Sequence, residues 1–430
     1  MAAVDTTGSA ISNVTGFRCV LCDGSLGPDH SGYTCPKCGD EGILDVEYDY
    51  ERAAPDFNAA ALAATPRRDL WRYAALLPAR PPEPWPGLPV GDTPLVHSTR
   101  LGDHVGLSDL WLKHDGLLPT GSLKDRASAV AVAQARERGV KIVAGASTGN
   151  AASSMAGLAA PAGLGTVIFV PAGAPAPKLA QVRTYGALVV AVQGSYDQAF
   201  DLCLAATRRF GWYSRNTAYN PVLSEGKKTV AFEVVEQLGW RAPDWIAVSV
   251  GDGCILGGVG KGLRDLHRLG LIDRLPRVIG VQSEGSSAIY RAWKAGAKTA
   301  APLVPDTLAD SISVGQPRDA VKALAVVRNT DGQMVAVSDE AILEAGHLLG
   351  RYAGIFAEPA ASTALAGVVA LRQRGDIAPD ARVAVLVTGN GLKDPKTTAR
   401  GTPEPLSIPP QEPALDVVLA ALDARWPDRP

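Results

Sequence analysis

The stretch Trp245-Ile-Ala-Val-Ser-Val250-Gly-Asp-Gly-Cys-Ile-Leu-Gly-Gly258 joins an apolar run to a glycine-rich turn. A short apolar run that ends in glycines is typical of a strand buried on both faces, as in a parallel sheet. The glycines let the backbone curl so that its N–H groups surround a phosphate where the next helix begins. The loop has neither the G-x-x-x-x-G-K-S/T nor the G-x-G-x-x-G pattern, so a nucleotide-binding fingerprint is not indicated.

Similar apolar runs recur from about Val90 onward and alternate with helical segments such as the Ala-rich stretch 127–137. These runs are predicted strands, at 110–113, 141–144, 166–170, 188–192, 278–281 and 383–387. Strands that alternate with helices indicate an α/β protein with doubly wound parallel sheets. Ligands of such folds bind at the carboxyl ends of the strands.

Three more segments at or near predicted strand ends carry chemical groups. Ala146–Asn150 precedes a predicted helix, and the free N–H groups of a helix start suit a carboxylate. Thr388 follows the last strand and offers a hydroxyl, and Lys124 lies in the polar loop Pro119–Ser128. Each segment alone is more often an ordinary turn or a solvated side chain. Together with the loop at 251–258 they form the set of groups that a pyridoxal phosphate enzyme uses.

The overall composition argues against several classes of partner. The 430 residues suggest two or three domains, and 42 Lys and Arg residues nearly balance 44 Asp and Glu residues, which disfavours nucleic-acid binding. The N-terminus lacks the basic and apolar regions of a signal peptide. The uncharged stretch from Ile142 to Pro177 is interrupted by Gly, Pro, Ser and Asn, so we expect buried strands and a helix there, not a membrane span. We therefore expect a cytoplasmic protein.

Four of the six cysteines form two C-x-x-C pairs, Cys19 with Cys22 and Cys35 with Cys38. Two such pairs at this spacing are typical of a zinc ribbon, in which four thiolates surround the metal. Two disulfides or four free thiols are the alternatives, and a cytoplasmic setting disfavours disulfides. A shell filled by four protein ligands predicts a structural zinc, and the alternating strand 43–50 would close the ribbon.

These features predict four segments. A zinc-ribbon-like module at 1–50 is followed by a Pro- and Ala-rich linker arm at 51–88, because Pro78–Pro86 holds too many prolines for a helix. The catalytic core is expected at 89–400, with a smaller subdomain at about 128–222, and a C-terminal tail at 401–430.

The same segments resemble a known family, the fold-type II pyridoxal phosphate enzymes, and within it the threonine synthase group. Pro119–Arg126 is similar to the segment that carries that family's cofactor-binding lysine, and residues 251–258 are similar to its phosphate loop. Further similar segments are Ser147–Asn150, Glu225–Thr229, Glu358–Ala360 and Thr388–Asp394. The ribbon resembles the start of some bacterial and archaeal members, and the resemblance spans about residues 17–395. It implies two doubly wound parallel-sheet domains of the tryptophan synthase β and threonine synthase type, in a homodimer.

The resemblance also implies roles for individual residues. Lys124 would form a Schiff base with pyridoxal 5'-phosphate and then move the Cα proton of an amino-acid substrate. Asn150 would contact the cofactor's phenolic oxygen, and Thr388 would face its pyridine nitrogen. Ser147 and Thr148 would hold the substrate carboxylate. The phosphate would lie on the backbone of Gly251, Asp252, Gly253, Cys254 and Ile255, with the Asp252 side chain turned away.

Several positions depart from the family pattern. Leu118 and Leu123 replace the usual Asn and Phe near the lysine, and Ala127-Ser128 replaces a Gly. The segment Thr307–Gly315 has Ser313 where threonine synthases carry an arginine. The residues implied for the cofactor are kept, so these departures concern the substrate.

The resemblance implies threonine synthase activity, which converts O-phosphohomoserine and water into threonine and phosphate. Five basic residues are candidates for a substrate-phosphate clamp: Lys178, Arg183, Arg215, Lys227 and Lys228. One alternative is β-replacement on a phosphorylated or acetylated serine, as in cysteate synthase. Another is α,β-elimination to a keto acid and ammonia. A non-catalytic protein that binds a partner through its ribbon is a third, and the presence of Lys124, Asn150 and Thr388 argues against it.

Overall fold

The computed structural model describes residues 13–80, 85, 87–174, 176–412 and 415–425. The chain divides into a compact unit that ends at Thr398 and a separate C-terminal segment that begins at Ala399. That segment contains the helix α15 (Leu415–Arg425). Within the described residues, no helix combines the length and the hydropathy needed to cross a membrane.

The larger sheet of the compact unit has six strands in the order β12-β11-β10-β13-β5-β4. Their bounds are β4 (Leu95–His97), β5 (Asp109–His114), β10 (Trp245–Ser249), β11 (Arg277–Ser283), β12 (Gln333–Val337) and β13 (Arg382–Val387). All neighbours pair in parallel except β4, which runs antiparallel to β5 at the edge. All five residues of β10 are buried, as the apolar run predicts.

Helices cover both faces of this sheet. Ile246 and Val248 of β10 pack in one apolar cluster with α8 (Val222–Gln237), α9 (Cys254–Arg268) and α11 (Ala320–Asn329). Trp245 and Ala247 point the other way and pack with α12 (Asp339–Ala353) and α13 (Pro359–Gln373). Alternate side chains of one strand thus enter two cores, which is why the strand is apolar from Trp245 to Val248.

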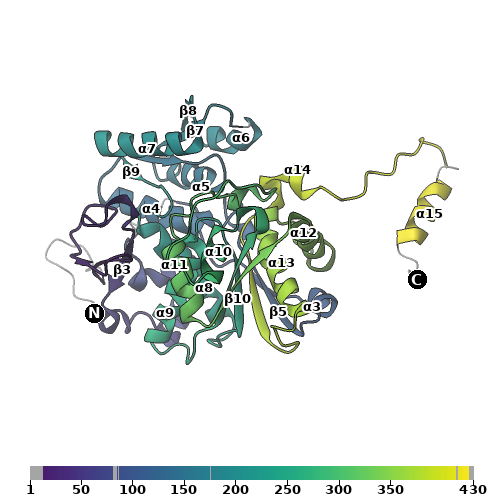
Figure 1. The fold of residues 1–430 in the computed structure, drawn as a ribbon, viewed down its shortest axis with the longest axis horizontal. Helices are drawn as coiled ribbons and strands as arrows, with labels where there is room; N and C mark the ends of the chain where they lie inside the picture. Colours follow the sequence, from purple (N-terminus) through teal and green to yellow (C-terminus); the bar gives the residue numbers. More distant parts are fainter. Residues whose placement is uncertain (1–12, 81–84, 86, 175, 413–414, 426–430) are drawn as a thin grey trace. The chain divides into compact units, whose positions relative to one another are not determined.

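The smaller sheet has four parallel strands in the order β8-β7-β6-β9. Their bounds are β6 (Ile142–Ala146), β7 (Gly165–Pro171), β8 (Leu188–Val192) and β9 (Tyr213–Ser214). The helices α5 (Asn150–Ala159), α6 (Ala176–Thr184) and α7 (Tyr196–Phe210) lie around it, at the top of Figure 1. The predicted fold, with two doubly wound sheets, is confirmed. The structure adds an antiparallel edge strand.

The N-terminal residues 13–48, here called the cysteine module, form a three-stranded antiparallel sheet with the order β2-β1-β3. The strands are β1 (Val14–Cys19), β2 (Ser25–Leu26) and β3 (Leu44–Tyr48), and the 3-10 turn η1 covers Gly39–Glu41. The predicted strand after the second cysteine pair is therefore present as β3. The module is drawn in purple at the left of Figure 1.

The arm that follows the cysteine module packs on the outside of α8. It contains α1 (Tyr50–Ala53), α2 (Ala59–Ala64) and η2 (Leu70–Leu76). The Phe232 ring of α8 has its centroid 5.0 Å from that of Phe57 and 5.3 Å from that of Tyr73. Aromatic pairs at these separations stabilise packing beyond the area that they bury.

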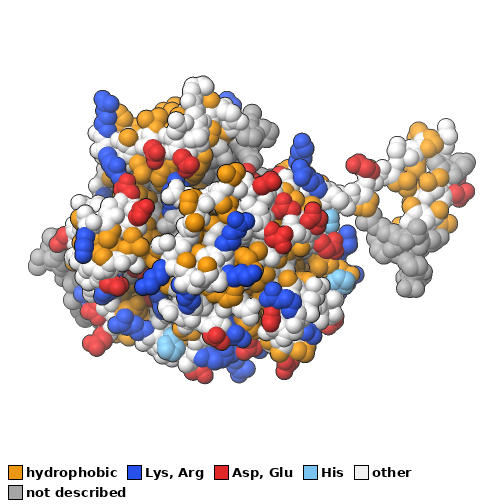
Figure 2. Space-filling view, viewed as in Figure 1, with side chains coloured by type: hydrophobic (Ala, Val, Ile, Leu, Met, Phe, Trp, Pro, Cys, Tyr) orange, Lys and Arg blue, Asp and Glu red, His pale blue; other side chains and the backbone are white. Residues whose placement is uncertain are grey.

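The remaining helices are short or connect the two sheets. α4 (Lys124–Glu137) packs against both α5 and α8. The others are α3 (Thr99–Val105), η3 (Asp115–Leu117), η4 (Glu284–Ser286), α10 (Ala288–Lys294), η5 (Asp310–Ile312), η6 (Gly391–Lys393) and α14 (Pro395–Thr398). On the face shown in Figure 2, basic and acidic side chains are interspersed.

A buried ion cluster fixes the start of α4 to α8. The Arg126 side chain is fully buried, and its guanidinium pairs with Asp115 at 2.7 Å and with Glu233 at 2.6 Å. Lys113 pairs with the second oxygen of Glu233, also at 2.6 Å. Burial by itself would raise the pKa of Glu233, but the charges of Arg126 and Lys113 outweigh it and lower the pKa to about 2.

This cluster predicts an acid-sensitive stability. Because the folded-state pKa of Glu233 lies below its ordinary value of 4.5, its contribution is present above pH 4.5 and is lost as the pH falls toward 2. At pH 7, Glu233→Gln is expected to lower the free energy of unfolding by about 3–5 kcal/mol, since it leaves buried cations without a counter-charge. Urea unfolding at a series of pH values measures both effects.

The difference between the wild-type protein and Glu233→Gln should shrink as the pH falls from 4.5 toward 2. The matched control is Glu344→Gln on α12, because that carboxylate is 56% exposed. A difference that stays constant over this pH range would contradict the assignment of the charge to Glu233.

Candidate active site

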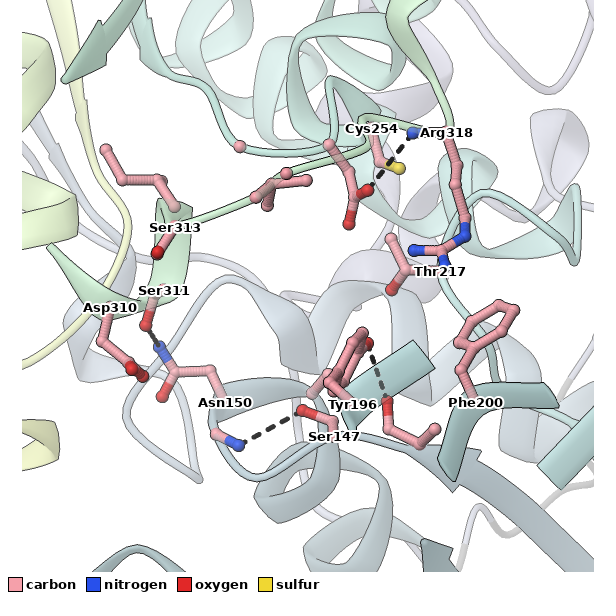
Figure 3. Close-up of a pocket in the computed structure, with 18 of the residues that line it drawn as sticks. Ser147, Asn150, Tyr196, Phe200, Thr217, Cys254, Asp310, Ser311, Ser313 and Arg318 are labelled. Atoms are coloured by element: carbon pink, nitrogen blue, oxygen red, sulfur yellow. Dashed lines mark hydrogen bonds between the residues drawn. The ribbon is translucent and has the colours of Figure 1, made fainter. Parts of the chain in front are cut away.

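A cavity of about 610 Å³ lies where strands of both sheets end. It is lined by Lys124, by the loop after β6, by the loop after β10 and by residues between 302 and 318. Figure 3 shows this cavity with Ser147, Asn150, Cys254 and Ser311 turned toward it from different segments. The structure thus brings together the predicted residues Lys124, Ser147, Thr148, Asn150 and 251–255. Thr388 is buried nearby and does not line this cavity.

Lys124 is the first residue of α4 and faces the cavity. The segment before it is tied to the end of β13, because the Leu123 N–H donates to the Thr388 carbonyl at 2.8 Å. Burial lowers the pKa of Lys124 to about 8, and the positive charges of Lys227 and Arg215 act in the same direction. An amine with a lowered pKa is more often unprotonated at neutral pH and is therefore a better nucleophile.

The glycine loop between β10 and α9 leaves no room for side chains at two positions. Gly253 has a φ of +97°, and a Cβ there would lie 2.8 Å from the Asp319 carbonyl oxygen. A Cβ at Gly251 would lie 3.1 Å from the Cα of Ile312. The Asp252 carboxylate accepts a hydrogen bond from the Arg318 N–H at 3.3 Å. The loop therefore presents backbone to the cavity at the start of the 15-residue helix α9, which favours an anion.

Two buried cations in the cavity have unsatisfied nitrogen atoms. Among the described residues, Lys227 Nζ and Arg215 Nε are buried without a hydrogen-bond partner. Arg215 donates through Nη1 to the Thr217 hydroxyl at 2.9 Å. Burial lowers the pKa of Lys227, and it lowers that of Arg215 to about 10. Buried unpaired cations are costly, so this end of the cavity is built for an anionic ligand.

The other basic candidates are placed differently. Lys228 does not line the cavity, because it turns the opposite way and pairs with Glu225 at 2.6 Å and Asp265 at 2.7 Å. Arg183 is exposed on α6, and the side chain of Lys178 lies outside the described part of the chain. Arg215 and Lys227 are the only ones of the five predicted candidates that the described structure places in the cavity.

Glu358 is a site residue whose role the sequence did not reveal. It is buried, and its two oxygens accept hydrogen bonds from Asn150 Nδ2 at 2.7 Å and from Ser311 Oγ at 3.2 Å. A Cβ at Gly389 would lie 2.1 Å from Glu358 Oε1, so any larger residue there would require the Glu358 side chain to move. Burial raises the pKa of Glu358. The only sequence signal was its place directly before Pro359 in a segment similar to the family.

Glu358 lines a second cavity of about 580 Å³ that adjoins the first, and it is not part of the wall of the first cavity. The two cavities share the wall formed by residues 148–150, Asp310 and Ser311. The amide of Asn150 spans this wall, since it donates both to Glu358 and, at 3.3 Å, to Ser311 Oγ. Asn150 is thus held in one orientation by partners from two other segments.

The segment that departs from the family pattern lies at the cavity. Residues 310–315 line it, including Ser313. At the mouth, the guanidinium of Arg318 lies 4.1 Å from the centre of the Phe200 ring and pairs with Asp197 at 3.2 Å. Figure 3 shows Arg318 above Thr217 and Phe200. The departure at Ser313 therefore falls on the wall of this cavity, whereas Leu123, Ala127 and Ser128 do not line it.

Comparison with known proteins gives the chemistry of this site. Residues 87–389 match the family described as pyridoxal-phosphate dependent enzyme. The chain belongs to this family. The residues of the cavity fit the cofactor: an amine with a lowered pKa, a glycine loop at a helix start and buried cations without counter-ions. Pyridoxal phosphate is therefore the cofactor of this chain.

Individual members of the family give a closer comparison. The threonine synthase of Methanocaldococcus jannaschii is 38% identical over 395 residues, which cover 91% of this chain and 96% of that protein. The threonine synthase of Methanosarcina acetivorans is 39% identical over 394 residues, which cover 91% of this chain and 95% of that protein. The solved structure of threonine deaminase isoform 2 from Solanum lycopersicum has a TM-score of 0.61 at 22% identity, covering 69% of this chain and 79% of its own. The last similarity shows the shared fold.

The contacts of Glu358 predict the effect of removing it. Glu358→Ala is expected to lower the free energy of unfolding by about 1–3 kcal/mol, because Asn150 and Ser311 lose a buried acceptor. It should also weaken cofactor retention, since Asn150 is no longer held. Urea unfolding and equilibrium dialysis of the cofactor measure the two effects.

Glu358→Gln keeps an oxygen for Asn150 and should show a smaller loss of stability. The exposed Glu344→Ala serves as the control and should stay within about 0.5 kcal/mol of the wild-type protein. If Glu358→Ala behaved like this control, the role given to Glu358 would be wrong.

Proposed function

We propose that this chain is a pyridoxal phosphate-dependent threonine synthase, which converts O-phosphohomoserine and water into threonine and phosphate. The observation that carries the proposal is the similarity to two threonine synthases over 91% of this chain and almost all of theirs. The residues of the cavity support it. The cofactor and the substrate each carry a phosphate, and two anionic ligands suit a site with several buried cations.

The bound cofactor would supply an electron sink for the charge that develops on the substrate's carbon atoms. Lys124 would hold the cofactor through its amine and, once the substrate has replaced it, would move the proton at the substrate's Cα. A base acts best when its pKa lies near the working pH, and the pKa of about 8 at Lys124 meets this condition.

The other predicted residues would hold cofactor and substrate. Asn150 would contact the phenolic oxygen, Thr388 would face the pyridine nitrogen, and the backbone of 251–255 would bind the cofactor phosphate. Ser147 and Thr148 precede the N-terminus of α5 and would bind the substrate carboxylate. Thr388 is a neutral hydroxyl, which leaves a pyridine nitrogen unprotonated and suits the loss of a good leaving group.

The substrate's phosphate would bind to Arg215 and Lys227. Both side chains are buried, both line the cavity, and both have a nitrogen without a partner among the described residues. Arginine can bind a phosphate through two N–H groups, and lysine adds a point charge. Because the site is buried, water is excluded from it, and the lower dielectric strengthens both interactions.

A second candidate function rests on Ser313. It lines the cavity at the position where threonine synthases carry an arginine. Without that charge, the cavity could accept a shorter substrate, and the reaction would be β-replacement or α,β-elimination on a related amino acid.

The deciding experiment is an assay with O-phosphohomoserine. We expect one threonine for each phosphate released, measured by amino-acid analysis and by phosphate detection. Release of a keto acid and ammonia from serine or threonine, with no turnover of O-phosphohomoserine, would favour the second candidate. A protein that retains the cofactor and turns over no amino acid would contradict both.

Replacing Lys124 tests the cofactor assignment directly. Lys124→Ala should abolish turnover and covalent cofactor attachment, because the amine is lost. Reduction with borohydride followed by mass spectrometry detects the attachment, and visible absorbance reports the bound cofactor. Lys141→Ala is the control, since Lys141 is exposed. Covalent attachment that persists in Lys124→Ala would place the nucleophile elsewhere.

We also infer that the cysteine module holds one structural zinc ion. The sulfur atoms of Cys19, Cys22, Cys35 and Cys38 all lie within 4.8 Å of one another. A tetrahedral site with Zn–S distances of about 2.3 Å places its sulfurs about 3.8 Å apart. The distance between Cys22 Sγ and Cys35 Sγ is 3.8 Å, which agrees with such a site.

Metal analysis of freshly purified protein should find about one zinc per chain. Cys35→Ser should lose the metal and destabilise the module, because a structural zinc contributes directly to folding. Cys203→Ser is the control. Cys203 is a buried thiol far from the cluster in sequence, and its sulfur accepts a hydrogen bond from Asn216 Nδ2. If wild-type protein purified in a reducing buffer contained no metal, this inference would be wrong.

A further inference from the structure

The cysteine module meets the core through buried charged groups. Lys322 of α11 and Lys261 of α9 both reach the strand β3 of the module. Tyr48 of β3 donates to Glu225 of α8 at 2.8 Å. These three helices carry or follow residues of the active-site cavity, so the module contacts the elements that shape the site rather than a remote surface.

Lys322 makes both of its polar contacts in this interface to β3. Its ammonium donates to the Leu44 carbonyl at 2.8 Å and pairs with Asp45 at 2.7 Å. The Lys322 side chain is only 8% exposed. A buried cation with two close partners is held firmly, because losing Asp45 would leave its charge uncompensated and losing the carbonyl would cost a hydrogen bond. The position of β3 therefore fixes the position of Lys322.

The start of α11 lies directly against the glycine loop. Asp319, one helical turn before Lys322, donates its N–H to the Asp252 carbonyl at 3.0 Å. A Cβ at Gly253 would lie 2.8 Å from the Asp319 carbonyl oxygen, and one at Gly257 would lie 3.2 Å from Lys322 Cβ. These close contacts leave no free space, so a displacement of α11 has to displace the loop.

The Asp319 carboxylate makes this arrangement sensitive to Asp45. Both of its oxygens are buried, beside the Cys254 thiol, and the positive charge of Lys322 acts on them. Asp45 and Asp319 thus offer Lys322 two alternative carboxylates. Without the charge of Asp45, Lys322 would be drawn toward Asp319, at the foot of the glycine loop.

We propose that Asp45 and Lys322 position the Gly251–Gly253 loop, so that the cysteine module sets the affinity of the site for the phosphate of its cofactor. The proposal rests on the proposed function in one respect, namely that this loop binds the cofactor phosphate. It gives the module a role in cofactor binding, with Asp45 and Lys322 as positioning residues that do not touch the cofactor.

An exposed ion pair between the module and the core supplies a matched control. Asp40 of the module pairs with Arg208 of α7 at 2.8 Å, but the two side chains are 59% and 57% exposed. Exposed pairs contribute little because water and salt screen them. Asp40→Asn therefore removes a charge from the same module without disturbing the buried interface.

The experiment compares two ligands on the full-length chain. Wild-type protein, Asp45→Asn and Asp40→Asn are freed of cofactor, checked for equal metal content, and titrated with pyridoxal 5'-phosphate and with pyridoxal, which lacks the phosphate. Asp45→Asn should raise the Kd for pyridoxal 5'-phosphate by about 5- to 150-fold, the usual range for coupling between sites, and leave the Kd for pyridoxal unchanged. Asp40→Asn should have the same Kd values as the wild-type protein for both ligands.

If Asp45 had a purely structural role, Asp45→Asn would raise the Kd values for both ligands by the same factor. That result, or an unchanged Kd for pyridoxal 5'-phosphate, would overturn the proposal. Should Asp45→Asn fail to fold, Lys322→Gln carries the same expectation. Wild-type protein that binds both ligands equally well would overturn the assignment of the loop itself, and with it the cofactor site of the proposed function. If the wild-type protein binds pyridoxal 5'-phosphate more tightly than pyridoxal and Asp45→Asn has the same two Kd values, only the role of the module is overturned.

Discussion

The structure depends on a guanidinium that has been taken completely out of water. Arg126 follows Lys124 by two residues, and its charge is balanced by Asp115 before α4 and by Glu233 on α8. These partners come from two separate segments of the chain, so they fix the position of the helix start. The amine of Lys124 is thereby presented to the cavity from a part of the chain that cannot shift without separating buried charges.

The same physical rule recurs through the rest of the core. Lys228 is surrounded by Glu225 and Asp265, and Lys322 by Asp45 and a backbone carbonyl. These scaffold cations have carboxylate or carbonyl partners within the protein. Lys227 and Arg215 have no carboxylate partner among the described residues, and both line the cavity. Where a buried charge is left unpaired, the ligand is expected to supply the counter-charge.

Much of this arrangement could be predicted from the sequence. The run at 245–250 and its glycine loop predicted β10, the turn and α9, because apolar runs and glycines report local geometry. The two-residue strand β9 is too short to show any periodicity. Glu358 is 208 residues from Asn150, and no local pattern shows that they touch. Lys227 and Lys228 are adjacent in sequence, yet only the three-dimensional fold shows which one faces the cavity.

The unpaired cations of the cavity have a consequence for the lifetime of the protein. Without an anion, the folded chain bears the full desolvation penalty of Lys227 and Arg215, which the unfolded chain in water does not. Binding to the folded state alone stabilises it by about 2.7 kcal/mol when the ligand is present at a hundred times its Kd. Newly made chains that have not met the cofactor would therefore open more often, and proteases act on open chains. The supply of cofactor would in this way decide how much of the protein persists as well as how much of it is active.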